Sequence, residues 1–129
     1  MALWCLLAAP LFAGNDLTEM TPASRDILTN AEVIAVDQDA AGIQGHRVWQ
    51  EGPIQIWLKP LRDGAAALGV FNTNGRPMDA TVPFKEIGLS EVIHARDLWS
   101  HADLGTLRQT LHATVPGHGV VLWIVSSRK

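Results

Sequence analysis

The hydrophobic pattern of the chain changes near residue 44, and this change limits the folds that its 129 residues can adopt. Before residue 44, apolar residues follow helical spacing; after it, apolar and polar residues alternate with a period of two. One strand shows the alternation clearly, with Ile54, Ile56 and Leu58 on one face and Gln55, Trp57 and Lys59 on the other. The pattern predicts α/β structure in residues 1–43 and an all-β domain in residues 44–129.

The first segment contains three predicted helices and one short strand. Residues 1–9 contain no helix-breaking residue, so they predict a helix that ends before Pro10. The apolar residues 10–14 that follow predict a very short buried strand. Thr21 and Pro22 form a helix start, which predicts a helix over residues 22–28. Asn30 is the expected N-cap of a helix over residues 31–36. A single strand cannot bury itself, so this segment must pack against something else.

The second segment has the pattern of an antiparallel sandwich. A hairpin turn at Asp63-Gly64 separates two strands, and further turns follow every 8–12 residues or so. The period is two from about His46, and the pattern predicts strands over residues 54–59, 65–71, 79–84, 91–98, 107–115 and 120–125. We treat residues 107–115 as one continuous strand. About seven short strands predict a β-sandwich of the Greek-key type.

Composition excludes several function classes. Hydrophobic residues make up 47% and charged residues 18% of the chain, as in globular proteins, and a net charge of −3 argues against a nucleic-acid partner. Cys5 is the only cysteine, and the histidines lack metal-type spacing, so we expect no metal and no cofactor.

The apolar stretch Met1–Ala13 is too short to span a membrane. It could instead be a secretory signal without the usual basic residues, and secreted, periplasmic and cytoplasmic locations all stay open.

Short motifs support a more specific interpretation because they run in a fixed order along nearly the whole chain. They are Met1–Trp4, Ala8–Leu11, Asn15–Leu17, Gln38-Asp39, Trp57–Leu61, Arg96–Trp99 and Val115–Leu122. The ordered set resembles the C-terminal part of the α-galactosidase/α-N-acetylgalactosaminidase family of retaining, melibiase-like glycoside hydrolases. The resemblance implies that residues 1–43 are the last segment of a truncated (β/α)₈ barrel, and that residues 44–129 are the sandwich that packs on it.

The resemblance also implies a function for the parent enzyme. The family hydrolyses terminal α-galactosides with two aspartates, one a nucleophile and one a general acid/base, both on earlier barrel strands. We therefore expect no catalytic residue in this chain and both aspartates upstream of Met1. The fragment is expected to be inactive alone, its sandwich to stabilise the barrel, and substrate to bind through the barrel. The alternative is a secreted β-sandwich carbohydrate-binding module with Met1–Ala13 as its signal peptide.

Three residues are candidates for substrate binding. Met1 corresponds to a methionine that lines the galactose pocket in the family. Asn15 and Asp16 follow the predicted barrel strand, at the end where such barrels carry their active sites. The structural alternative is that Asp16 caps a turn and Asn15 bonds to backbone. Asp37 and Asp39 are expected to end a helix in solvent rather than to act as paired acids.

The sequence also predicts where three tryptophans lie and which partner Arg96 has. Trp4 and Trp123 lie in apolar runs and are expected in the core. Trp57 lies on the polar face of its strand, so we expect it to be exposed and to contact the barrel. Arg96 and Asp97 are expected to pair with each other as a structural contact.

Overall fold

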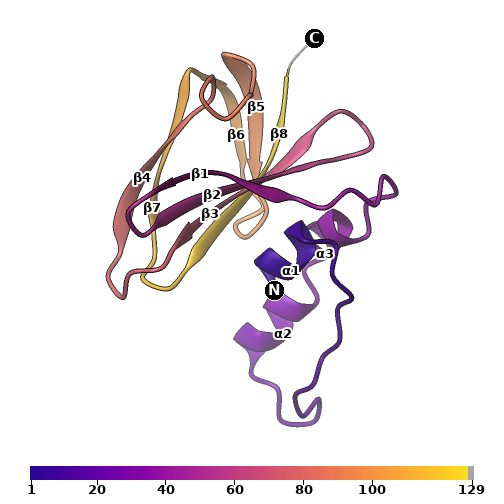
Figure 1. The fold of residues 1–129 in the computed structure, drawn as a ribbon. Coiled ribbons are helices and arrows are strands. Elements are labelled where there is room, and N and C mark those ends of the chain that lie inside the picture. Colours follow the sequence, from indigo (N-terminus) through magenta and orange to yellow (C-terminus); the bar gives the residue numbers. More distant parts are fainter. Residues whose placement is uncertain (128–129) are drawn as a thin grey trace.

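The computed structural model describes residues 1–127, which form two antiparallel sheets and three short helices (Figure 1). The helices are α1 (Ala2–Leu6), α2 (Pro22–Leu28) and α3 (Ala31–Asp37). The strands are β1 (His46–Glu51), β2 (Ile54–Pro60), β3 (Ala66–Asn72), β4 (Met78–Pro83), β5 (Val92–Asp97), β6 (Asp103–Arg108), β7 (Thr110–Val115) and β8 (Val120–Ser126). The large sheet has the order β1-β2-β3-β8-β5-β6, and the small one pairs β4 with β7. The predicted β-rich sandwich is confirmed.

The main hydrophobic core lies between the two sheets. Ile56 and Val70 enter it from the large sheet, and Val82 and Leu111 enter it from the small one. Because side chains alternate along a strand, every second residue of β2, β3 and β8 points to the opposite face of the large sheet. That outer face is also covered.

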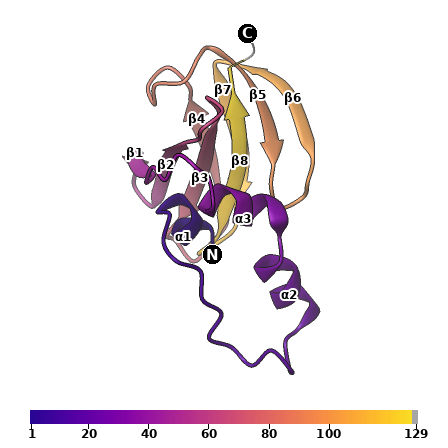
Figure 2. The same cartoon turned by 90° about the vertical axis from the view of Figure 1, so that its right-hand side faces the viewer.

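The helices cover the outer face of the large sheet. Figures 1 and 2 show α1 and α3 side by side against this sheet, with α2 farther away. A second buried cluster joins Leu6 of α1 and Val33 of α3 to Ala67 and Leu122 of the sheet. The chain therefore has two apolar layers, one inside the sandwich and one between the sandwich and the helices.

The helices of residues 21–38 follow their predicted start signals. The Thr21 side chain accepts a hydrogen bond from the Ser24 amide, with Pro22 at the first helical position of α2. The side-chain oxygen of Asn30 accepts from the amides of Glu32 and Val33 at the start of α3. These local signals fix where the two helices begin.

Residues 10–14 do not form the predicted strand. They are irregular, and Figure 2 shows them in a long segment that extends away from the sheets. A strand needs a neighbour to satisfy its backbone N–H and C=O groups, and no strand within residues 1–127 pairs with this segment. Phe12 is 83% exposed as a result.

The predicted continuous strand over residues 107–115 is also wrong. Gln109 has a φ of 65°, which breaks the strand and separates β6 in the large sheet from β7 in the small one. The Gln109 amide donates to Glu91 O at 2.7 Å, and its carbonyl accepts from the Phe84 amide at 3.0 Å. These bonds hold the corner, which a pattern of alternating side chains cannot reveal because the alternation continues through it.

The tryptophan predictions have mixed outcomes. Trp123 is 2% exposed, as predicted, whereas Trp4 is 55% exposed because only one side of the short α1 faces the sheet. Trp57 points away from the sandwich core as predicted, but it is half-buried rather than exposed. Its ring packs edge-on against Phe71 at 6.4 Å, within the layer under the helices.

Candidate functional site at the junction of helices and sandwich

Lys59 is the central polar residue of the junction between the helices and the large sheet. Its side chain is completely buried, although it lies on the polar face of β2 by sequence. Nζ donates to Cys5 O at 3.0 Å and to Val36 O. Both carbonyls belong to the last turns of helices, α1 and α3, where the helix dipole favours a positive charge. One ammonium group therefore ties two helices to the sheet.

The surroundings of Lys59 change the acidity of its neighbours. Burial lowers the pKa of Lys59, while Asp37 and Asp39 oppose that shift by favouring the charged form. Burial, together with the negative charge of Asp37, raises the pKa of the Cys5 thiol to about 11. Cys5 therefore stays a neutral thiol inside the junction, and its chemistry is that of a small apolar residue.

Asp37 does not end α3 in solvent as the sequence predicts. It is half-buried, and its Oδ1 atom is buried without a hydrogen-bond partner. The nearby positive charge of Lys59 compensates for this burial. Asp39 accepts hydrogen bonds from the amides of Ala41 and Arg62, so it fastens the chain after α3 to the β2–β3 turn.

Two glycines allow α1 to approach the sheet closely. A Cβ atom at Gly69 would lie 2.7 Å from Leu6 Cδ1, so the missing side chain on β3 makes room for Leu6. A Cβ atom at Gly45 would lie 2.9 Å from Leu6 O, and the Gly45 amide donates to that oxygen at 2.7 Å. The end of α1 is thus seated on the sheet by close packing and by a backbone hydrogen bond.

A second set of contacts joins α3 to the end of β5. Asn30 Nδ2 donates to Leu98 O at 2.8 Å in a buried position, while Asn30 Oδ1 caps α3. Arg96 binds Glu32 with two hydrogen bonds of 2.7 and 2.8 Å, and His101 Nδ1 lies 2.7 Å from Glu32 Oε1. Residues more than 60 positions apart in the sequence meet here.

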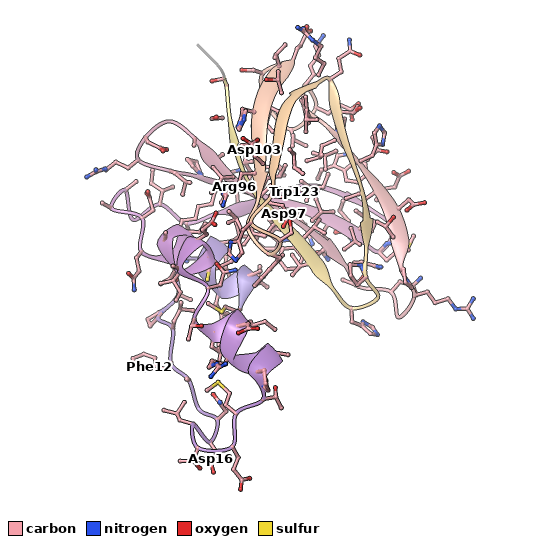
Figure 3. The ribbon with its side chains drawn as sticks, turned by 180° about the vertical axis from the view of Figure 1, so that it is seen from behind. Phe12, Asp16, Arg96, Asp97, Asp103 and Trp123 are labelled. Atoms are coloured by element: carbon pink, nitrogen blue, oxygen red, sulfur yellow. The ribbon has the colours of Figure 1, made fainter. Side chains whose placement is uncertain are left out.

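Arg96 and Asp97 do not pair with each other as predicted. Consecutive residues of a strand point to opposite faces, so Arg96 reaches Glu32 on α3 while Asp97 turns to the other side. Asp97 Oδ2 accepts a hydrogen bond from Trp123 Nε1 at 3.1 Å, and Oδ1 accepts from the amides of Trp99 and Ser100. Figure 3 labels Arg96, Asp97 and Trp123, which lie close together on the neighbouring strands β5 and β8.

We expect the Glu32–Arg96–His101 cluster to stabilise the junction only when Glu32 is ionised. The hydrogen bonds from Arg96, with His101, lower the pKa of Glu32 from 4.5 to about 2. A pKa lower in the folded than in the unfolded chain gives stability that is present above pH 4.5 and lost as the pH falls towards 2. Glu32→Gln should lower the free energy of unfolding at pH 7 by about 1 kcal/mol, and this difference should shrink by pH 3.

Urea denaturation at pH 7, 4.5 and 3 measures both quantities. Glu91→Gln is the control because it is the same substitution at an exposed glutamate outside the cluster, whereas Glu32 is half-buried within it. A Glu32→Gln deficit that is the same at pH 7 and pH 3 would show that the ionised cluster does not stabilise the junction.

The three candidate substrate-binding residues are not brought together, because Met1 packs at the edge of the junction cluster while Asn15 and Asp16 lie away from it. Met1 is half-buried and lines a cleft of about 330 Å³ whose walls are mostly apolar, with Trp4, Leu11, Phe12 and Ile34 among them. Asn15 and Asp16 are exposed at the far end of the extended segment (Figure 3). Asp16 Oδ1 accepts from the Thr18 amide and hydroxyl, and the hydrogen bonds from Thr18 lower the pKa of Asp16.

Carboxylates of the described residues are not arranged for acid–base catalysis around the Met1 cleft. The lining of that cleft contains no Asp or Glu. Within residues 1–127 there is no group of three or more His, Cys, Asp or Glu side chains placed to hold a metal ion. In the same part of the chain, no helix is long and apolar enough to cross a membrane.

The comparisons with known proteins agree with this geometry. The family model "Alpha galactosidase C-terminal beta sandwich domain" matches residues 51–125, and the model "Alpha galactosidase A" matches residues 1–39. The chain belongs to the α-galactosidase family. In this family the sandwich packs on the barrel, and here the helices of residues 1–39 pack on the large sheet of the sandwich.

Individual relatives in the α-galactosidase family match nearly the whole chain. Alpha-galactosidase 2 of Arabidopsis thaliana is 37% identical over 99% of this chain and 33% of its own length. Alpha-galactosidase A of Cellvibrio japonicus is 34% identical over 98% of this chain and 34% of its own length. The chain thus spans about a third of the curated relatives that it matches.

Solved structures of the family have the same fold. Alpha-galactosidase I from Mortierella vinacea superposes with a TM-score of 0.90 at 30% identity, over 98% of this chain and 35% of that one. A GH27 β-L-arabinopyranosidase from Geobacillus stearothermophilus superposes with a TM-score of 0.88 at 28% identity, over 98% and 28% of the two chains.

Sequence reasoning missed the residues that hold the junction. The alternation places Lys59 on the polar face of its strand, and the sequence does not pair Glu32 with Arg96. Their partners are backbone carbonyls and a distant arginine, which a local pattern does not identify. One signal was available for Lys59: it lies between Leu58 and Pro60, on a strand face that also carries the large aromatic Trp57, which suggests a covered face.

Proposed function

We propose that this chain is the C-terminal part of a retaining glycoside hydrolase that acts on terminal α-galactosides. In this proposal residues 1–43 belong to the catalytic barrel, residues 44–129 are the sandwich, and the sandwich stabilises the barrel without supplying a catalytic group. The observation that carries the proposal is the junction: residues that match an α-galactosidase model are fastened to the sandwich through Lys59, Asn30 and Glu32.

The exposed apolar surface of the first segment fits a place inside a barrel. Phe12 is 83% exposed and Leu17 is 67% exposed, and both lie on the segment that has no strand partner within residues 1–127. Neighbouring barrel strands would cover these side chains and pair with the backbone of residues 10–14. We propose that Met1, Asn15 and Asp16 then lie at the substrate end of the barrel.

The chemistry of the proposed reaction needs groups that these residues do not provide. Retaining hydrolysis uses two carboxyl groups about 5–5.5 Å apart, one to attack the anomeric carbon and one to protonate the leaving oxygen. Glu32, Asp37 and Asp39 are instead engaged in the junction, and Asp16 is held by Thr18. The nucleophile and the acid are therefore assigned to barrel strands that precede this part of the family's fold.

The β-L-arabinopyranosidase among the similar structures suggests which sugars a related pocket can accept. β-L-Arabinopyranose has the ring of galactose without the exocyclic CH₂OH group, so one related pocket can serve both sugars. Terminal galactosides remain the proposal because the curated relatives described above carry that name. The carbohydrate-binding module with Met1–Ala13 as a signal peptide is not favoured, because Ala2, Cys5 and Leu6 are buried in the junction.

The proposal predicts that residues 1–129 alone hydrolyse no α-galactoside. The purified chain, incubated with 4-nitrophenyl α-galactoside, should release nitrophenol no faster than buffer does. The Asp16→Asn variant should behave identically. Hydrolysis by the unaltered chain that Asp16→Asn abolishes would make Asp16 catalytic and would contradict the assignment of both carboxylates to other strands.

A further inference from the structure

A second cleft, of about 490 Å³, lies on the side of the sandwich away from the helices. It opens between the β1–β2 hairpin and β4, and it is lined by Trp49 and Ile54 on one side and by Met78 and Ala80 on the other. The small sheet has two strands and the large one has six, so part of the inner face beside β1 stays uncovered. The volume is within the range of small-molecule sites in proteins.

Trp49 provides an aromatic wall. It pairs with Ile56 across β1 and β2, and Ile56 is a core residue, so Trp49 lies on the inner face of the large sheet. It is half-buried: part of its ring packs against the core, and part lines the cleft. An aromatic ring that is both supported from behind and open in front is a rigid platform for a ligand.

The cleft lining contains three acidic residues and no Lys or Arg. Glu51 comes from the end of β1, Asp79 from β4 and Glu86 from the turn after β4, and all three are exposed. They therefore approach the cleft from different elements. Carboxylates are strong acceptors for hydroxyl groups, and each can accept from two neighbouring hydroxyls.

Hydrogen bonds hold the Asp79 carboxylate and the turn after Glu51 without a ligand. Thr114 Oγ1 donates to Asp79 Oδ1 at 2.6 Å. Glu51 ends β1 at a two-residue turn in which Gly52 has a φ of 53°. Both the amide and the hydroxyl of Thr73 donate to Pro53 O, at 2.9 and 3.1 Å, and this fixes the turn. These bonds order β4 and the β1–β2 turn, the two elements that border the cleft.

We propose that this cleft is a saccharide subsite, separate from the barrel, that takes a neutral pyranose. The C–H face of the sugar would lie on Trp49, and its hydroxyls would donate to the carboxylates of Glu51 and Glu86. A flat aromatic wall with acceptors on several sides suits a ring with hydroxyls on its edge better than it suits a linear basic peptide. The choice of a galactoside as that sugar rests on the proposed function.

Binding of methyl α-galactoside and raffinose to residues 1–129 tests this subsite. The indole N–H signals in ¹H–¹⁵N spectra report on the five tryptophans separately, and a Trp49→Phe variant assigns the signal of Trp49. We expect saturable shifts at Trp49. We expect Trp49→Ala to weaken binding at least tenfold, about the effect of truncating an aromatic anchor. Glu86→Lys should weaken binding without disturbing the core, because Glu86 is exposed. Trp57→Phe, on the opposite face of the sheet, is the control.

The possible results distinguish failure of this subsite from failure of the proposed function. Absence of shifts at Trp49, or sugar-induced shifts of backbone amide signals that Trp49→Ala and Glu86→Lys leave unchanged, would overturn the subsite while leaving the barrel assignment intact. Binding of a tri-lysine peptide at Trp49, with no response to either sugar, would also overturn it and would make the cleft a site for basic peptides. Sugar binding at Trp49 by a chain that fails to complete an α-galactosidase would support the subsite alone.

Discussion

Replacing Lys59 by methionine is expected to lower the free energy of unfolding by about 3 kcal/mol, although methionine has nearly the same length and can stay buried. The substitution removes two hydrogen bonds from a charged donor, to Cys5 O and Val36 O. It also leaves the half-buried Asp37 without its nearby positive charge. Lys59→Met also removes the cost of burying a charged ammonium group, which offsets part of the lost stability. The expected destabilisation is therefore at the low end of the range for removing one partner of a buried ion pair.

Urea denaturation measures the loss, and hydrogen exchange locates it. Amides of α1 and α3 should exchange faster in Lys59→Met, while those of β3 and β8, inside the sandwich, should change less. Lys85→Met, at an exposed lysine in the turn after β4, is the matched control and should be neutral. A Lys59→Met variant as stable as the Lys85→Met variant would show that the helices are held by apolar packing alone.

The helix starts and most strands were predictable because their signals are local. Thr21-Pro22 and Asn30 define α2 and α3 through hydrogen bonds that span three residues or fewer. The alternation in β2 and the Asp63-Gly64 turn define the β2–β3 hairpin, where Gly64 has the positive φ that the turn requires. In these places sequence and structure differ only by a residue or two at the boundaries.

The failed predictions involve residues whose environment depends on distant parts of the chain. Residues 10–14 are apolar enough for a strand, but a strand exists only if another pairs with it. Gln109 continues the alternation of its neighbours while its backbone turns the chain into the other sheet. Trp4 was assigned to the core from its apolar neighbours, but a five-residue helix has only one covered side.

The candidate site shows the same division. The ordered motifs predicted the family and the sandwich, because each motif is a run of a few consecutive residues that can be read directly from the sequence. The junction was not predictable, because Lys59 finds its partners 23 and 54 residues away and Arg96 finds Glu32 64 residues away. Charge type alone does not say which of ten basic residues is buried.

A hybrid enzyme is expected to recover hydrolytic activity, which is the second large effect. The part of Mortierella vinacea alpha-galactosidase I that precedes its match to this chain can be joined to residues 1–129, since the two backbones superpose with a TM-score of 0.90 over 98% of this chain. The hybrid should regain hydrolysis that the truncated Mortierella enzyme lacks, because residues 1–43 would complete the barrel and the sandwich would brace it. Errors of about 1 Å in the placement of reacting groups can cost about 100-fold in rate, so activity within about 100-fold of the parent is the expected range.

The rate of 4-nitrophenyl α-galactoside hydrolysis by this hybrid tests the central claim most directly. The account predicts activity in the hybrid, none in the truncated enzyme, none in residues 1–129 alone, and a lower melting temperature for the hybrid that carries Lys59→Met. A folded hybrid that hydrolyses the substrate no faster than buffer, or a truncated enzyme as active as its parent, would contradict it.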